Sequence, residues 1–182
     1  MTSKLFRVAL LFGAFGCAAS DGYSKAPATF SGTITAVSDG DTFTVKSCNG
    51  RTCRLVKVRL HGVDCPEVKH YRNEVDQPGG REALDYVVKT YLGKGVIVSP
   101  ISTSYGRVVA RVDAGGTDVA RDLIVHGFAM LDPRYSKDKE LIAAQDKASC
   151  DDLGIWSGDE NPIPPWEWRR NNKAKIVQLR KK

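Results

Sequence analysis

The chain is organised around nine consecutive residues, Arg59-Leu60-His61-Gly62-Val63-Asp64-Cys65-Pro66-Glu67. An apolar strand leads into them, and Gly62 and Pro66 then bend the chain. The bend presents an arginine and two carboxylates close together, a composition that suits phosphate chemistry. An arginine can grip a phosphate through two parallel N–H bonds, one carboxylate can hold a hard divalent cation, and another can position or deprotonate a water. For this stretch alone, a strand-end turn with solvated charges is the alternative.

The residues before this stretch predict two further strands. Residues 30–37 are rich in β-forming residues and end at Ser38-Asp39-Gly40-Asp41, whose Asp-Gly pair predicts a hairpin into residues 42–46. Residues 54–63 alternate, with the apolar side chains on one face, so Arg59 points away from the main apolar set.

After the stretch, residues 68–80 are polar and predict a loop. Helices are predicted at residues 83–92, 118–126 and 136–153, and short strands at 96–99 and 108–112. This order predicts an α+β, mainly β fold: a five-stranded OB-type Greek-key barrel with three packed α-helices. Such a fold leaves the function undecided.

The first residues have the pattern of an export signal. Lys4 and Arg7 precede an apolar run at residues 8–16, and small residues follow it, so we expect residues 1–19 to be a secretory signal peptide. The run is too short for a permanent membrane span. We therefore expect a secreted, extracellular protein, with a periplasmic location also compatible; a lipoprotein anchored through Cys17 is the alternative.

The 182 residues suit one domain with a sizeable core. We expect a flexible lead-in at 20–29, the barrel domain at 30–168 and a basic tail at 169–182. The tail holds seven basic residues and no acid, which predicts salt-sensitive attraction to polyanions; a solubilising, disordered end is the alternative. Trp166 and Trp168, just before it, are expected to pack on the barrel, with an exposed binding surface as the alternative.

Four cysteines remain after removal of the signal: Cys48, Cys53, Cys65 and Cys150. Four thiols allow three pairings. The Asn-Gly pair between the first two predicts a hairpin that brings them together, so we favour Cys48–Cys53 and, for the others, Cys65–Cys150. A four-cysteine zinc site is disfavoured, because the spacings lack paired Cys-x-x-Cys knuckles.

Three sequence motifs are each weak evidence of function alone, but their order along the chain makes the combination specific. They are Asp39-Gly40-Asp41-Thr42, the stretch 59–67, and Tyr105-Gly106-Arg107. Together, over residues 34–156, they resemble the staphylococcal nuclease (thermonuclease) family. Residues 122–129 also resemble the family's second helix with its glycine stop, and residues 153–156 resemble its closing segment.

The resemblance implies a Ca²⁺-dependent nuclease that cleaves DNA and RNA at the 5′ oxygen and leaves 3′-phosphates. It assigns Asp41 and Asp64 as the carboxylate ligands of the cation, and the backbone carbonyl of Cys65 as a third ligand. Asp39 is placed just outside this shell.

The same resemblance assigns the remaining site residues. Glu67 orients or deprotonates the attacking water, and Arg59 and Arg107 grip the phosphate. Tyr105 and Tyr135 flank the nucleotide, and because stacking tolerates any base, little sequence specificity is expected.

We expect a monomer with no stable protein partner. The rival functions are an OB-fold module that binds nucleic acid without cleaving it, and a lipid-anchored surface protein. The sequence leaves open the preference for DNA or RNA and the balance of endo and exo cleavage.

Overall fold

The computed structural model describes residues 28–69, 75–158 and 161–179. Five strands form a closed barrel in the order β1-β2-β3-β6-β5. Their bounds are β1 Phe30–Asp39, β2 Thr42–Asn49, β3 Thr52–Leu60, β5 Gly95–Ser104 and β6 Arg107–Asp113. Neighbouring strands are antiparallel except β3 and β6, which are parallel. This confirms the predicted OB-type, mainly β architecture.

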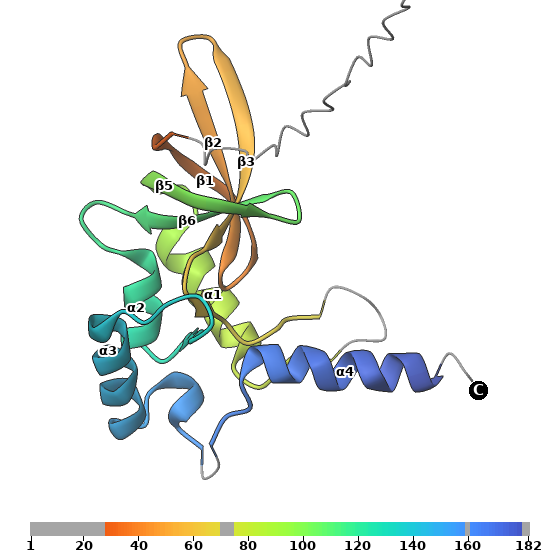
Figure 1. Cartoon of the computed structure of the whole chain (residues 1–182). Coiled ribbons are helices and arrows are strands. Elements are labelled where there is room, and N and C mark those ends of the chain that lie inside the picture. Colours follow the sequence, from red (N-terminus) through yellow and green to blue (C-terminus); the bar gives the residue numbers. More distant parts are fainter. Residues whose placement is uncertain (1–27, 70–74, 159–160, 180–182) are drawn as a thin grey trace, which may run out of the picture.

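The barrel interior follows from the alternation of the strands. Apolar side chains at every second position of each strand point inward, and polar ones face outward. The interior residues are buried almost completely and include Ile34, Phe43, Val45, Val58, Val98 and Val112. The β2–β3 hairpin projects from one end of the barrel, and the helices gather at the other end (Figure 1).

Three helices lie where the sequence predicts them, within a few residues. They are α1 Gly80–Tyr91, α2 Val119–Val125 and α3 Lys139–Cys150, with a short 3-10 helix at Gly154–Trp156. Asp118 and Asp138 cap α2 and α3, since each side chain accepts a hydrogen bond from a backbone N–H of the first turn. Burial of Ala83, Val87 and Tyr91 attaches α1 to the barrel.

A fourth helix, α4 Pro165–Leu179, was not predicted. Its sequence has no apolar stripe at helical spacing, so no hydrophobic period indicates a helix there. Pro165 suits the first helical position, where its fixed φ is helical and its missing N–H has no cost. The helix includes residues 169–179, most of the segment that we interpreted as a basic tail.

A second, two-stranded sheet was also missed. It joins β4 Val63–Asp64 to β7 Met130–Leu131. The backbone N–H of Asp132 extends the pairing by donating to the carbonyl of Gly62 at 2.9 Å. This sheet fixes the bend after β3 to the segment that follows α2.

The cysteines confirm one predicted pair and contradict the other. Cys48 and Cys53 form a disulfide across the β2–β3 hairpin, where they face each other in register. The prediction of a Cys65–Cys150 bond is wrong, because both thiols are free. Cys65 is buried against Gly40, whereas Cys150 is exposed at the end of α3.

The predicted signal peptide and most of the lead-in lie outside the described residues, as do residues 70–74 of the polar loop. Within the part of the chain that the structure describes, we find no helix with the length and apolar character needed to cross a membrane.

Candidate active site

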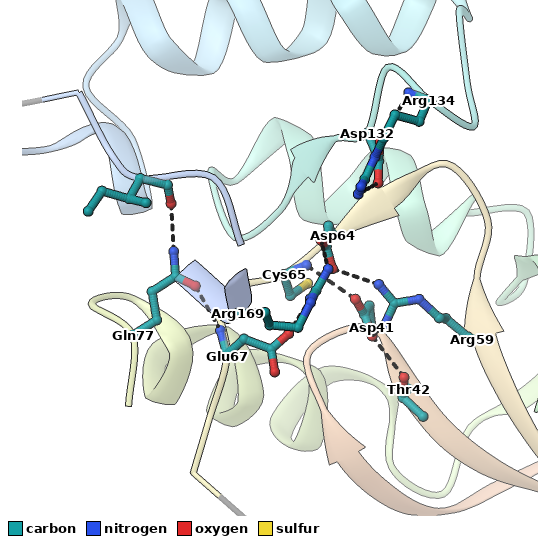
Figure 2. A network of polar contacts seen from close by, with 11 residues as sticks. Asp41, Thr42, Arg59, Asp64, Cys65, Glu67, Gln77, Asp132, Arg134 and Arg169 are labelled. Atoms are coloured by element: carbon teal, nitrogen blue, oxygen red, sulfur yellow. Dashed lines mark hydrogen bonds and ion pairs between the residues drawn. The ribbon is translucent and has the colours of Figure 1, made fainter. Parts of the chain in front are cut away.

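Two buried carboxylates meet one arginine at the end of the barrel. Asp41 lies in the β1–β2 turn, Arg59 is the penultimate residue of β3, and Asp64 ends β4. Arg59 Nη1 donates to Asp41 Oδ1 at 2.8 Å, and Nη2 donates to Asp64 Oδ1 at 2.6 Å. The arginine therefore bridges two acids that are far apart in the sequence (Figure 2).

Strand pairing explains why these groups converge. Thr42 pairs with Arg59 in the β2–β3 ladder, and the carbonyl of Asp41 accepts the backbone N–H of Leu60 at 2.9 Å. The Asp41 carboxylate also accepts the Thr42 hydroxyl at 2.8 Å and the backbone N–H of Cys65 at 3.2 Å. Asp41 is thus held by the barrel on one side and by the bend on the other.

Burial dominates the electrostatics of the two acids. It raises the pKa of Asp41 to about 6, with Asp39 adding to the rise and Arg59 opposing it. Burial also raises the pKa of Asp64, although a hydrogen bond from Arg169 and the charges of Arg169 and Arg59 oppose the rise. Burial alone would lower the pKa of Arg59, but Asp41 and Asp64 raise it overall. Desolvated carboxylates of this kind favour a nearby cation.

Glu67 lies beside the pair at the start of the polar loop. Its pKa is raised by burial, so the carboxylate is more basic than a solvated one. Its backbone is clamped by the buried Gln77: the Gln77 side chain accepts the Glu67 N–H at 3.2 Å, and the Gln77 N–H donates to the Glu67 carbonyl at 2.8 Å. Sequence reasoning missed this clamp, because a glutamine inside a polar loop gives no signal of burial.

Arg169 of α4 completes the cluster. Its Nη1 and Nη2 donate to the two carboxylate oxygens of Asp64 at 3.0 and 2.6 Å, and Nη1 also donates to Glu67 Oε1. Figure 2 shows its guanidinium between Asp64 and Glu67. The sequence assigned this residue to the tail, where it is one of several basic residues with nothing to distinguish it.

The sequence of this chain also matches a family of known proteins. The family described as staphylococcal nuclease homologue matches residues 57–158. This chain belongs to that family.

Relatives of this staphylococcal nuclease homologue carry names of nucleases. A staphylococcal-like nuclease of Arabidopsis thaliana is 33% identical over 119 residues, which cover 65% of this chain and 34% of that protein. An uncharacterized endonuclease of Haemophilus influenzae is 29% identical over 145 residues, 79% of this chain and 75% of that protein. An endonuclease of Bacillus subtilis is 30% identical over 168 residues, 83% of this chain and 13% of that protein. The chain spans 33%, 34% and 30% of the length of three plant relatives.

Another buried acid, Asp132, directly follows β7 and was also missed. It is 3% exposed, and its carboxylate accepts hydrogen bonds from Arg134 Nε at 2.8 Å and Nη2 at 2.6 Å. Burial alone would raise the pKa of Asp132, but Arg134 lowers it overall. The Asp-Pro-Arg order indicates only a turn in the sequence. In the structure the Arg134 backbone N–H also donates to Asp132 Oδ1 at 3.0 Å, so the ion pair belongs to this turn.

Arg107 begins β6, and Tyr105 lies in the β5–β6 turn that precedes it. Val109 pairs with Arg59 between β6 and β3, so Arg107, two residues earlier, shares the sheet face of Arg59. Tyr105 occupies the turn with φ of 50° and is 96% exposed.

Tyr135, the other predicted stacking residue, is also exposed, and the Arg134 guanidinium lies 5.5 Å from its ring centroid. The structure thus brings together Asp41, Arg59, Asp64, Cys65 and Glu67. Among the described residues, no hydrogen bond or ion pair joins this cluster to Tyr105, Arg107 or Tyr135.

The donor set suits a hard cation with few protein ligands. Among the described residues, no three His, Cys, Asp or Glu side chains are grouped to hold a metal ion. Two desolvated carboxylates nevertheless face the same arginine, and oxygen donors of this kind are those that Ca²⁺ accepts together with backbone carbonyls and waters.

Proposed function

We propose that this chain is a Ca²⁺-dependent nuclease that hydrolyses phosphodiester bonds of DNA and RNA at the 5′ oxygen and leaves 3′-phosphates. One observation carries the proposal: Arg59 bridges the buried Asp41 and Asp64, and Glu67 lies beside them. The names of the nuclease relatives support the same reaction class.

Asp41 and Asp64 would hold the Ca²⁺, with the backbone carbonyl of Cys65 as a third ligand. A bound divalent cation would neutralise the charge that develops on the phosphate. With two protein carboxylates, we expect a weak site, in the range of about 10⁻⁴–10⁻³ M that is typical of extracellular calcium modules.

The other residues have roles that follow from their chemistry. Glu67, with its raised pKa, accepts the proton of the attacking water or orients that water. Arg59 and Arg107 stabilise the phosphate oxygens as negative charge builds up, and Tyr105 and Tyr135 stack on the bases. Because none of these contacts reads base edges, cleavage has little sequence specificity.

The test is cleavage by the chain from residue 20 to 182, with single-stranded DNA and RNA in calcium. We expect both to be cut and the products to carry 3′-phosphate ends, detected by their resistance to 3′ extension until phosphatase is added. Binding without cleavage would support the OB-fold binding module instead. Products with 3′-hydroxyl ends would overturn the assigned bond.

We also propose that the protein is exported. The Cys48–Cys53 disulfide supports this, because such bonds persist in oxidising compartments. Expression of the full chain should give a protein that begins near residue 20 outside the cytoplasm. Labelling of Cys17 by a radioactive fatty acid would indicate the lipid-anchored alternative.

A further inference from the structure

Arg169 lies where a cation would bind. Asp64 Oδ1 accepts hydrogen bonds from Arg59 Nη2 at 2.6 Å and Arg169 Nη1 at 3.0 Å, and Oδ2 accepts Arg169 Nη2 at 2.6 Å. The Asp64 side chain is 0% exposed in this arrangement. A carboxylate has about four lone-pair positions, so the two arginines occupy most of them.

A divalent cation and Arg169 therefore exclude each other at Asp64. Calcium coordinates carboxylate oxygens at about 2.3–2.6 Å, which would place it against the Arg169 guanidinium. Two positive charges at that distance in a desolvated site repel strongly. Since Arg169 also holds Glu67, its departure would free the proposed base together with the metal ligand.

Arg169 is easier to displace than Arg59. Arg59 belongs to β3, which pairs with β2 on one side and β6 on the other. Arg169 belongs to the last helix, and its side chain is 33% exposed. Elements with few buried contacts open at low free-energy cost.

Among the described side chains of α4, which end at residue 172, the attachments to the rest of the protein lie at the start of the helix. Gln77 Nε2 donates to the Ile163 carbonyl at 2.6 Å, and the Arg134 guanidinium lies 5.2 Å from a Trp166 ring centroid. Trp168 lines a pocket with Phe128 and Ile155. Trp166 and Trp168 are both only half-buried, so they pack near the site without being sealed into a core.

We propose that Arg169 is an internal competitor of the divalent cation at Asp64: it neutralises Asp64 and Glu67 in the cation-free protein, and Ca²⁺ displaces it. This rests on the proposed calcium chemistry. Helix α4 thereby sets the calcium concentration at which the site can cleave. In protein without bound calcium, Glu67 is paired with Arg169 and cannot act as the base.

Calcium binding measured by calorimetry tests this without reference to activity. The proteins compared are the wild type, Arg169→Gln, and Arg170→Gln as a matched control. Arg170 is the exposed neighbour of Arg169 and pairs with Glu167 at 3.8 Å. We expect Arg169→Gln to bind Ca²⁺ more tightly by roughly 5- to 150-fold, the usual range of coupling between competing interactions. Arg170→Gln should match the wild type.

The outcomes separate the two proposals. Equal calcium affinity in wild type and Arg169→Gln, or weaker affinity in the variant, would overturn the competition while leaving the calcium site in place. Absence of calcium binding in all three proteins would overturn the calcium chemistry itself and the competition with it.

A second measurement uses the unaltered protein. Nitrogen-15 NMR of the arginine side chains reports the hydrogen bonds of the Arg169 guanidinium directly. Calcium should shift the Arg169 signals toward those of a solvated arginine, with the same midpoint as the calorimetric binding. Arg169 signals that stay unchanged while calcium binds would overturn the proposal.

Discussion

At the scale of single residues, the site depends on Arg59, which pairs with two acids that burial makes costly to ionise. Removal of one preorganised donor to a charged transition state typically costs about 10²–10³ in turnover. We therefore expect Arg59→Ala to lower kcat by about that factor on single-stranded DNA at saturating calcium. Lys57→Ala, an exposed neighbour on β3, is the control and should be near wild type. A folded Arg59→Ala protein, judged by circular dichroism, with normal kcat would remove Arg59 from the mechanism.

The Asp132–Arg134 pair predicts an acid-dependent part of the stability. Because Arg134 lowers the pKa of Asp132 below its ordinary 3.8, the folded state favours the charged form. The stabilisation is complete above the unfolded pKa and is lost as the pH falls through the lower folded pKa. Urea unfolding should show Asp132→Asn less stable than wild type by about 1–3 kcal/mol at pH 6.

At pH 2.5 this difference between wild type and Asp132→Asn should shrink, because the wild-type carboxyl is then losing its charge as well. A difference that is the same at both pH values would show that the pair stabilises through shape or neutral hydrogen bonding. Arg81→Gln, which breaks an exposed pair with Asp76, is the control and should change little at pH 6.

Single residues also show what a sequence can and cannot predict. The acids at 41, 64 and 67 stand in motifs, and their convergence follows from strand pairing that alternation already indicates. Arg169 and Gln77 stand in no motif, and they reach the site only because α4 and the polar loop fold back on it. Contacts of that kind depend on tertiary packing, which local patterns do not encode.

At the scale of elements, the barrel strands and the first three helices could be predicted from the spacing of apolar residues and from the turn residues. The short or polar elements could not. β4 and β7 have two residues each, too few for a period. The prediction for Cys65 failed because local patterns do not show tertiary packing. The even number of cysteines suggested a second disulfide, but the Cys65 thiol is free and packs against Gly40, next to α1.

The junction between α2 and the 3-10 helix depends on a close approach of two backbones. Gly127 has φ of 69°, its carbonyl accepts the Ile155 N–H at 2.9 Å, and an added Cβ would lie 2.1 Å from the Leu153 carbonyl oxygen. Gly127→Ala should therefore lower the free energy of unfolding by about 2–5 kcal/mol, from the left-handed backbone and the overlap together.

Gly115→Ala provides the matched control for urea unfolding. Gly115 has φ of 66°, but an added Cβ would meet no atom within 4 Å. Only the backbone strain remains, about 1–3 kcal/mol. Equal losses in the two variants would show that the approach to Leu153 does not constrain the fold.

At the scale of the whole molecule, charge is distributed unevenly. All 21 acidic residues precede residue 169, and seven basic residues follow Trp168. Arg169 is paired with Asp64 and Glu67, so we expect the remaining basic residues to supply the long-range attraction to a polyanion.

Substitution of Lys173, Lys175, Arg180, Lys181 and Lys182 by glutamine tests this attraction. We expect a higher KM for single-stranded DNA in 50 mM salt, little change in 200 mM salt, and an unchanged kcat, because counterion release weakens with salt. Loss of kcat at both salt concentrations would show that these basic residues take part in the chemistry.

We propose that Asp41 and Asp64 hold the calcium on which cleavage depends, and cleavage of single-stranded DNA during a calcium titration tests this. The wild-type chain should be inactive in excess chelator and half-active at about 10⁻⁴–10⁻³ M calcium. Asp41→Asn should need far more calcium or fail to cleave. Cleavage by the wild type in excess chelator, or the same calcium midpoint in Asp41→Asn, would contradict the account.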